Sequence, residues 1–436
     1  MSIWIYIMHP LAIIIVRKIA KFNGLSHMMV GNSLIHFILV SFFSSAAAAI
    51  VVSLWKSKKT SNQSGRYRAW AEINLAHLAQ NVKELKRRLP ADCRIMAVVK
   101  ANAYGHGSVP VAKCLQSIGV NAYAVAEIRE GVVLRKAGIQ GEILILGYTS
   151  PWQFEDLYQY ELTQTVINAD YAAALNQYSK KIKVHVKIDT GMGRLGENVE
   201  QVDRILSIYR QPHLTVTGTY SHFCVPDYDL EADIAFTKRQ IQCFYDLVHV
   251  IKSNGIEPGS LHLQSSYGIF HFSQLHCDLA RPGIALYGAI SAVKDNEEST
   301  FSLLPVLSLK ARVTMVKSVN AGTSIGYGRN YKTTQDSLIA TVSIGYADGV
   351  PRCLFEQGGH VLVKGQRAAI AGNICMDQMM IDVTHIEHVN EGDIVTLIGQ
   401  DGEYCIAAEE VAARCHTIPN ELLTGIGNRV DRVYVN

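Results

Sequence analysis

Eight apolar segments recur between residues 92 and 287, and their regular spacing constrains the fold more than any other feature of the sequence. Each has the length and the β-branched content of a buried strand. Amphipathic stretches, for example 75–89, 109–118 and 234–253, precede or separate them. Eight strand–helix alternations over roughly 215 residues are what a (β/α)8 barrel requires, so we predict an α/β fold of the TIM type. The segments end near Lys100, Glu127, Gly147, Asn168, Asp189, His222, Ser265 and Tyr287.

The pattern changes at Leu304, where β-rich segments replace the strand–helix alternation. They cover 306–319, 337–346, 366–374, 379–383 and 394–398, and one helix candidate, 407–415, interrupts them. We therefore predict a barrel at residues 68–303 and a C-terminal, mainly β domain at residues 304–436.

The first 60 residues differ from the rest of the chain. The apolar run at 28–55 contains no charge and exceeds the ~20 residues that a transmembrane helix needs, whereas the run at 3–16 is shorter. A signal peptide fits less well, because the second run is too long and no small-residue cleavage site comes after it. The basic cluster at 56–59 favours a cytoplasmic location for the remainder of the chain. We predict a membrane segment of one or two helices at 1–60, a polar linker at 61–67, and a catalytic domain that faces the cytoplasm from the cell membrane.

Charge and cysteine content exclude several functions. The formal net charge is +3 and no basic run is interleaved with aromatic residues, so nothing points to a nucleic-acid partner. The nine cysteines form no C-x-x-C pair, which is typical of reduced thiols rather than of disulfides or a zinc site. We expect no metal.

Lys100 ends the first predicted strand, and the Ala-Asn-Ala-Tyr-Gly-His-Gly after it cannot continue that strand. A lone lysine at a strand end usually extends its amine to solvent. Four other polar residues, however, fall at or after the ends of later strands, where TIM-type barrels build their sites. A desolvated lysine in such a site commonly forms a Schiff base with a carbonyl cofactor such as pyridoxal 5'-phosphate. The four residues are Arg194, His222, Ser265 and Arg281.

The eighth segment contains Arg281-Pro-Gly283, at the usual phosphate site of such barrels. Gly283 permits a close approach by an anion, and the amides of Gly283 and Ile284 with the Ser265 hydroxyl are expected to hold the cofactor phosphate. The alternatives are a helix cap for Ser265 and a surface salt bridge for Arg281.

Residues 97–107, Ala-Val-Val-Lys-Ala-Asn-Ala-Tyr-Gly-His-Gly, resemble the cofactor-lysine motif of alanine racemases. The resemblance continues in register from about Arg68 to the C-terminus through 187–194, 279–288, 324–329 and 372–378. It implies a racemase that depends on pyridoxal 5'-phosphate, acts as a homodimer, and places the early strand near 69–73 in the β domain.

The resemblance also implies roles for individual residues. Lys100 is the base on one face of the substrate, and Tyr327 of the partner subunit is the base on the other, with its pKa lowered through His222 and Arg281. Arg281 faces the pyridine nitrogen and Tyr104 contacts the phosphate. Lys187, either carbamylated or in an ordinary ion pair, orients Arg194. The substrate carboxylate would contact Arg194 and Met376, and the entrance would be lined by Tyr346, Cys375 and Asp377.

Two departures from the family pattern bear on the substrate. The phosphate motif reads Gln264-Ser-Ser-Tyr267 instead of the usual Asn-Ser-Ala, and Asn428 replaces a tyrosine beside the phosphate and the substrate side chain. Both resemble the membrane-bound serine racemases of the VanT type, from vancomycin-resistance operons. Because an amide adds hydrogen-bonding groups near a substrate hydroxymethyl, we predict racemisation of both L-serine and L-alanine, supplying D-amino acids for cell-wall precursors.

Four alternatives to this function are compatible with parts of the sequence. One is a plain alanine racemase with a membrane anchor. Another is an amino-acid decarboxylase on a related barrel, whose pyridine partner is normally acidic, unlike Arg281. A third is a non-catalytic barrel that carries the cofactor, which would lack the β domain and Tyr327. The last is a degenerate remnant of a two-part membrane protein.

Overall fold

The computed structural model describes residues 67–225, 230–290 and 302–436, together with Ser41. Residues 68–436 form one compact unit. The predicted membrane segment at 1–60, apart from Ser41, lies outside the described residues, as does most of the predicted linker. Among the helices within the described ranges, none combines the length and the apolar character needed to cross a bilayer.

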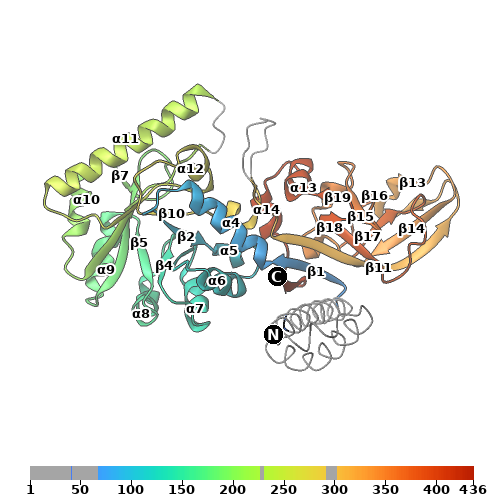
Figure 1. Cartoon of the computed structure of the whole chain (residues 1–436), viewed down its shortest axis with the longest axis horizontal. Helices are drawn as coiled ribbons and strands as arrows, with labels where there is room; N and C mark the ends of the chain where they lie inside the picture. Colours follow the sequence, from blue (N-terminus) through green and yellow to red (C-terminus); the bar gives the residue numbers. More distant parts are fainter. Residues whose placement is uncertain (1–40, 42–66, 226–229, 291–301) are drawn as a thin grey trace, which may run out of the picture. The chain divides into compact units, whose positions relative to one another are not determined.

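The N-terminal part of this unit is a parallel barrel, which confirms the predicted fold class (Figure 1). Its strands run in the order β10-β2-β3-β4-β5-β6-β8-β9. The barrel closes between β9 and β10, where the Asp278 amide donates to the Leu261 carbonyl at 2.9 Å and the Arg281 amide donates to the Gln264 carbonyl at 2.8 Å. The strands are β2 (Arg94–Val98), β3 (Ala122–Val125), β4 (Glu142–Ile145), β5 (Thr163–Val166), β6 (Ile182–Asp189), β8 (Leu214–Tyr220), β9 (Ser260–His262) and β10 (Leu279–Ala280), with the short β7 (Glu197–Asn198) beside β6.

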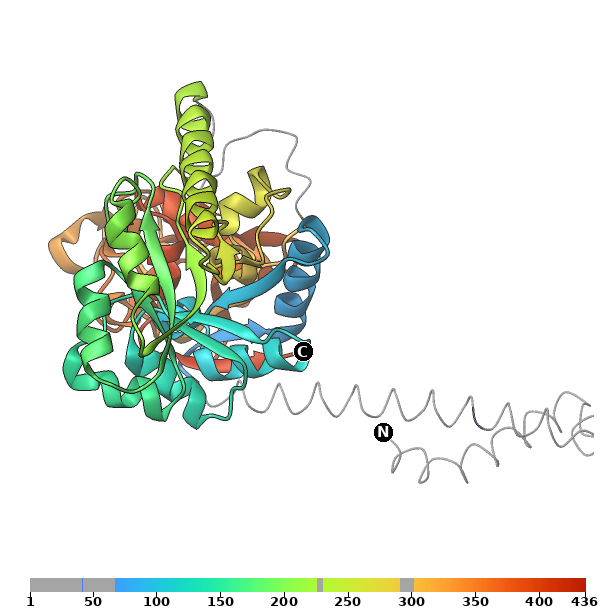
Figure 2. The same ribbon diagram turned by 90° about the vertical axis from the view of Figure 1, so that its left-hand side faces the viewer.

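Helices cover the outside of the barrel (Figure 2). Helix α4 begins where the Asn74 side chain accepts a hydrogen bond from the His77 amide, and it buries Leu78, Val82 and Leu85 at helical spacing. The helices of this part are α4 (Leu75–Arg88), α5 (Lys100–Tyr104), α6 (Ser108–Ser117), α7 (Ile128–Lys136), α8 (Phe154–Gln159), α9 (Ala169–Gln177), α10 (Val202–Tyr209), α11 (Glu231–Ser253) and α12 (Ser266–His271).

The eighth strand is shorter than predicted. The apolar run to Tyr287 suggests one strand, but β10 ends at Ala280 and residues Ile284–Tyr287 form the 3-10 helix η2. Pro282 has no amide hydrogen to continue the parallel ladder, so the chain leaves the barrel there. The predicted strands 337–346 and 366–374 also end early, at Val342 and Ile370.

The C-terminal part is a β domain whose main sheet closes on itself, because β18 pairs with both β15 and β11. The early strand β1 (Ala69–Asn74) lies in this sheet, antiparallel to β11 and parallel to β20. Helices α13 (Ala408–Arg414) and α14 (Pro419–Thr424) interrupt the strands. The other strands are β11 (Leu307–Val319), β14 (Ser337–Val342), β15 (His360–Val363), β16 (Gln366–Ile370), β17 (Met379–Asp382), β18 (Ile394–Asp401), β19 (Tyr404–Ile406) and β20 (Asp431–Val435), with the hairpin β12 (Ser324–Ile325) and β13 (Tyr331–Lys332).

The end of the chain packs against the turn after Lys100. The Arg432 guanidinium donates to the carbonyls of Gly105 at 2.9 Å, Gly427 at 2.6 Å and Ile426 at 2.7 Å. The Tyr434 hydroxyl donates to the His106 carbonyl at 3.2 Å. The β domain therefore helps to hold one wall of the barrel's mouth.

Candidate active site

A cavity of about 400 Å³ opens at the carboxyl ends of the barrel strands. Four cationic side chains line it, and no carboxylate does among the described residues. An excess of positive charge with no acidic partner favours a ligand with several negative charges, such as a phosphate monoester together with a carboxylate. The lining residues are Val98, Lys100, Tyr104, Ala126, Leu146, Gly147, Lys187, Arg194, Leu195, Tyr220, His222, Ser265, Ser266, Tyr267, Arg281, Gly283, Ile284 and Asn420.

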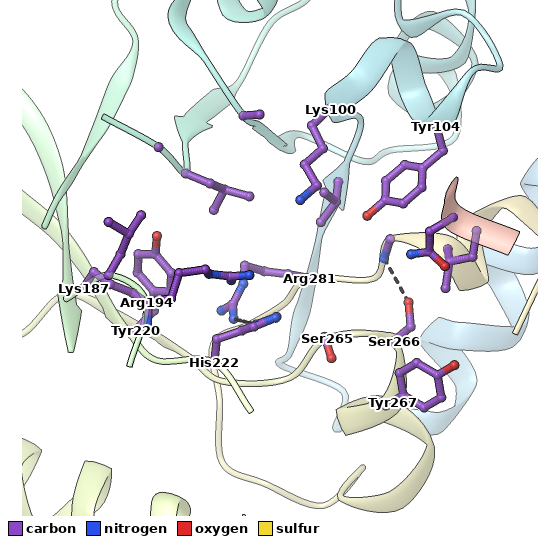
Figure 3. A pocket seen from close by; sticks show the side chains of 18 residues that line it. Lys100, Tyr104, Lys187, Arg194, Tyr220, His222, Ser265, Ser266, Tyr267 and Arg281 are labelled. Atoms are coloured by element: carbon purple, nitrogen blue, oxygen red, sulfur yellow. Dashed lines mark hydrogen bonds between the residues drawn. The ribbon is translucent and has the colours of Figure 1, made fainter. Parts of the chain in front are cut away.

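Lys100 comes after β2 and is the first residue of α5, and its amine points into the cavity (Figure 3). Burial lowers the pKa of this amine, and the positive charge of Arg194 lowers it further, while Glu130 opposes the shift. A lysine amine becomes a nucleophile or a base only when it loses its proton. The surroundings of Lys100 therefore favour its reactive form.

The turn after Lys100 is left-handed over four consecutive non-glycine residues. Ala101, Asn102, Ala103 and Tyr104 have φ angles of 51°, 54°, 55° and 52°. Left-handed geometry costs roughly 1–2 kcal/mol per such residue, so the surrounding structure has to impose it. The Glu130 carboxylate accepts from the Ala101 amide at 2.5 Å, and the Asn102 side chain accepts from the Ser108 amide at 2.8 Å. Through this turn Lys100 and Tyr104 both line the cavity.

Arg281 is buried, and none of its contacts within the described residues is to a carboxylate. Nη1 bonds to His262 Nδ1 at 2.5 Å and to the His262 carbonyl at 3.0 Å. Nη2 donates to the carbonyls of Ser221 at 2.7 Å and Leu263 at 3.2 Å, and it lies 3.2 Å from His222 Nδ1. Burial lowers the pKa of Arg281 to about 10, so the guanidinium keeps its proton at neutral pH. Among the described residues, no contact uses Nε, so its hydrogen is available to a group in the cavity.

His222 lies beside Arg281, as predicted, and is partly buried. Burial holds its pKa well below the ordinary value, and the charges of Arg281 and Lys187 lower it further. His222 is therefore neutral and accepts a hydrogen bond from Arg281 through Nδ1.

The predicted phosphate end of the cavity differs in detail from the sequence prediction. The Gly283 amide, expected to bind the anion itself, donates to the Ser266 hydroxyl at 3.0 Å, and the Ala285 amide donates to the same oxygen at 3.3 Å. Ser266 thus keeps a hydroxyl proton that it can donate into the cavity. Ser265 occupies the N-cap position of α12 without a capping hydrogen bond, so its hydroxyl is not used as a cap. Ile284 also lines the cavity.

Arg194 and Lys187 lie on the opposite wall (Figure 3). The Asp189 carboxylate accepts from the amides of Gly191, Met192 and Gly193, which folds the loop that places Arg194 at the mouth. Lys187 is buried, and its amine donates to the Ile188 carbonyl at 2.9 Å. Burial lowers the pKa of Lys187 to about 7, and Arg281 adds to the shift. With its pKa near neutrality, part of the Lys187 amine is uncharged, which suits carbamylation; this modification stays a prediction.

The predicted β-domain residues do not line this cavity. Tyr327, Tyr346 and Met376 are exposed, Tyr327 to 73%. Asn373 donates to the Tyr327 carbonyl, and the Tyr346 amide donates to the Cys375 carbonyl, so these residues gather on one surface. Asp377 pairs with Arg429 at 2.7 Å.

Asn428 is exposed and lies outside the cavity lining. The Arg432 guanidinium donates to the carbonyl of Gly427, the neighbour of Asn428, and also to the carbonyl of Gly105, at the end of the Lys100 turn. The structure thus holds the backbone beside Asn428 against this turn without placing the side chain in the cavity.

Four polar lining residues were not predicted as site residues from the sequence: Ser266, Tyr220, Tyr267 and Asn420. The departure at Ser266 was visible in the motif, but its bond to Gly283 was not. Tyr220 ends β8 and packs between the cations, with Arg281 at 4.9 Å and Lys187 at 5.3 Å from its ring. Tyr220 lies close to the predicted strand end at His222, and this position was the feature of the sequence from which it could have been found.

The residues present fit pyridoxal 5'-phosphate. Lys100, whose pKa is lowered, would meet the aldehyde of that molecule. The hydroxyl groups of Tyr104, Ser265 and Ser266 would meet its phosphate, and the unshared N–H of the buried Arg281 would meet its ring nitrogen. A TIM-type barrel with this site and an appended β domain defines the class: an enzyme that depends on pyridoxal 5'-phosphate.

The comparisons identify the family. Residues 73–291 match the N-terminal domain of alanine racemases and residues 306–434 match the C-terminal domain. An alanine racemase of Carboxydothermus hydrogenoformans is 43% identical over 84% of this chain and 99% of its own length. The chain belongs to the alanine racemase family and is a pyridoxal 5'-phosphate-dependent racemase.

Other relatives extend this result. An amino-acid racemase of Enterococcus faecalis is 42% identical over 94% of this chain, which spans 58% of that relative's length. The alanine racemase structure of Clostridium difficile 630 superposes with a TM-score of 0.79 at 37% identity, covering 85% of this chain and 96% of that one. A Bartonella henselae alanine racemase with covalently bound pyridoxal phosphate gives a TM-score of 0.73 at 28% identity, covering 85% and 100%.

We predict that Gly283→Ala weakens binding of pyridoxal 5'-phosphate. A Cβ at this position would lie 2.6 Å from the Tyr104 hydroxyl, so that hydroxyl must move. Loss of one hydrogen bond to a charged group corresponds to an increase in Kd of roughly 10- to 100-fold. Absorbance titration of the cofactor-free protein measures it. Tyr104→Phe should cause a similar loss, and the double variant should lose little more; fully additive losses would contradict the shared mechanism.

Proposed function

We propose that the protein interconverts the L- and D-forms of both alanine and serine by a two-base mechanism. The supporting observation is the cavity, in which a lysine with a lowered pKa lies among three other cations, with no carboxylate among the described lining residues. When bound, pyridoxal 5'-phosphate supplies an electron-withdrawing ring that acidifies the substrate α-carbon. The residues of the chain then have to bind the anions and move one proton on each face.

Lys100 is the proposed base on one face. Its amine lies in the cavity, and burial favours its neutral form, which can accept a proton from the α-carbon. Arg194, which lines the cavity, is the proposed partner of the substrate carboxylate. Arg281 would meet the ring nitrogen through its Nε hydrogen. Because a guanidinium does not give up its proton, Arg281 would leave that nitrogen unprotonated, which favours simple reprotonation of the substrate.

Tyr327 of a second copy is the proposed base on the other face. Within one chain this tyrosine is exposed and does not line the cavity, so a single chain supplies only one of the two bases. Tyr346 and Met376, both exposed, lie on the same β domain. A homodimer in which each β domain covers the partner's cavity would complete both sites.

Activity on serine is the finer part of the proposal. It is supported by Asn428, beside the Gly427 carbonyl that Arg432 ties to the Lys100 turn, and by Ser266 in the cavity. The Enterococcus relative is named an amino-acid racemase. The match with it spans 415 residues of the alignment, so it extends into the part of the chain that precedes residue 67. These features agree with the VanT-type resemblance. A plain alanine racemase is the second candidate, favoured by the C. hydrogenoformans relative.

We predict that the full chain forms D-serine and D-alanine at comparable rates, which chiral chromatography measures with Lys100→Ala as the inactive control. Asn428→Tyr should shift the serine-to-alanine ratio of kcat/KM towards alanine by roughly tenfold, because a phenol removes space and amide groups near the substrate hydroxyl. D-alanine as the sole product would identify a plain alanine racemase. No D-product from either substrate would overturn the proposed function.

Subunit complementation tests the role of Tyr327. Lys100→Ala and Tyr327→Phe should each lose about 10²- to 10⁴-fold in kcat, since each removes one acid–base group. Co-expression of the two variants with different tags should restore about a quarter of the wild-type activity, because half of the dimers then contain one intact site. The control is co-expression of two Lys100→Ala chains. Purified mixed dimers with no more activity than either variant would rule out a site shared between subunits.

We also propose that residues 1–60 anchor the protein in the cell membrane, with the catalytic domain facing the cytoplasm. The support is the uncharged run at 28–55 and the basic cluster directly after it. The full chain should sediment with membranes and need detergent for release, whereas the chain from Ser61 should remain in the supernatant. Equal partition of the two would contradict the anchor.

A further inference from the structure

A chain of buried polar side chains runs from Arg281 through the interior of the barrel. His262 Nδ1 contacts Arg281 at 2.5 Å, and His262 Nε2 lies 2.9 Å from His185 Nδ1. His185 Nε2 lies 2.9 Å from the Glu142 carboxylate. Both histidines are fully buried, and Glu142 is the first residue of β4. This line of side chains therefore connects the amino-terminal end of the barrel with the cavity at the other end.

Only one arrangement of protons satisfies these contacts. A guanidinium has no acceptor, so His262 Nδ1 has to accept from Arg281, and the proton of this ring is then on Nε2. That proton is donated to His185 Nδ1, which leaves the His185 proton on Nε2, facing Glu142. Both imidazoles are neutral in this arrangement. Burial holds the pKa of His262 well below its ordinary value, and Arg281 lowers it further, in agreement with a neutral ring.

The residues around His185 and His262 fit this geometry. A Cβ at Gly218 would lie 2.6 Å from the His185 ring, so the glycine makes room for it. The Tyr220 ring stacks on His262 at 4.6 Å and 8°. Within the described residues, His185 Nε2 is buried and makes no well-aligned hydrogen bond, and the carboxylate oxygen of Glu142 lies 2.9 Å from it. Burial raises the pKa of Glu142, but its contact with His185 and nearby Arg94 outweigh burial and leave that pKa below the ordinary value.

We propose that Glu142 is a positioning residue for the racemase reaction. As the terminal acceptor, it accepts from His185 Nε2 and holds both imidazoles in line, and thereby orients Arg281 with its unshared N–H towards the cavity. It also supplies the negative charge that Arg281 lacks in direct contact. Without a carboxylate at Glu142, Arg281 still requires an acceptor at His262 Nδ1, so both rings keep their tautomers, but the Nε2–H of His185 loses its acceptor and the His185 ring loses the contact that holds it in line.

Nitrogen-15 NMR of the histidine rings tests this tautomer directly. The full chain, labelled at histidine and loaded with pyridoxal 5'-phosphate, should show His185 and His262 protonated on Nε2, with signals assigned through His185→Gln and His262→Gln. Glu142→Ala should keep both tautomers, which Arg281 imposes, but should shift the His185 Nε2 signal, because its proton loses the carboxylate acceptor. Glu142→Gln retains an acceptor and should shift that signal less. If Glu142→Ala folds poorly, Glu142→Leu fills the same space without an acceptor.

Kinetics provide the second readout. Loss of a supporting hydrogen-bond partner typically costs about tenfold in activity, so we expect Glu142→Ala to lower kcat about tenfold with little change in KM, and Glu142→Gln to stay within about twofold of wild type. The matched control is Glu72→Ala, a partly buried carboxylate that pairs with Lys310 at 3.1 Å in the β domain, which should leave both readouts unchanged.

Two results would overturn the proposal: an unchanged His185 Nε2 signal in Glu142→Ala or Glu142→Leu, or the same loss of kcat in Glu142→Gln as in Glu142→Ala. The kinetic readout rests on the proposed function, whereas the NMR readout does not. A protein without racemase activity but with the predicted shift of the His185 Nε2 signal would therefore separate failure of the proposed function from failure of the positioning role of Glu142.

Discussion

The burial of Arg281 is the constraint on which the rest of the site depends. A buried cation without a carboxylate in contact is unfavourable unless several oriented acceptors replace its water. Here those acceptors are the carbonyls of Ser221, His262 and Leu263 and two histidine nitrogens. The carbonyls lie at or just after the ends of strands β8 and β9, so the closed barrel itself creates the environment of the guanidinium. That environment leaves Arg281 charged and one of its N–H groups available to the cavity.

Strain is concentrated in the turn after Lys100. Four left-handed residues are held by Glu130 from one side and, through Arg432, by the C-terminal segment from the other. Because Arg432 lies in β20, the β domain stabilises the barrel loop that carries Lys100. The strand that carries Arg432, β20, pairs with β1, so the support of this loop is anchored in the main sheet of the β domain.

Much of the site could be predicted because barrel strands end at a common face. Lys100, Arg194, His222, Ser265 and Arg281 lie at or after strand ends in the sequence, and all of them line one cavity. The phosphate end could not be predicted in detail. A motif shows that Ser266 replaces alanine, but only the fold brings its hydroxyl to the amides of Gly283 and Ala285. The end of β10 was also misjudged, because an apolar run does not distinguish a buried strand from a buried 3-10 helix.

By itself, the sequence determined the order of strands and helices, the two-part organisation of residues 68–436, and the residue types at the mouth of the barrel. These follow from local periodicity and from motifs, which depend on short stretches of chain. The tertiary structure alone decided the left-handed turn, the exposure of Tyr327 and the line of contacts from Glu142 to Arg281. Each of these depends on groups from strands or loops far apart in sequence, and such long-range packing leaves no periodic signal in the residues that it joins.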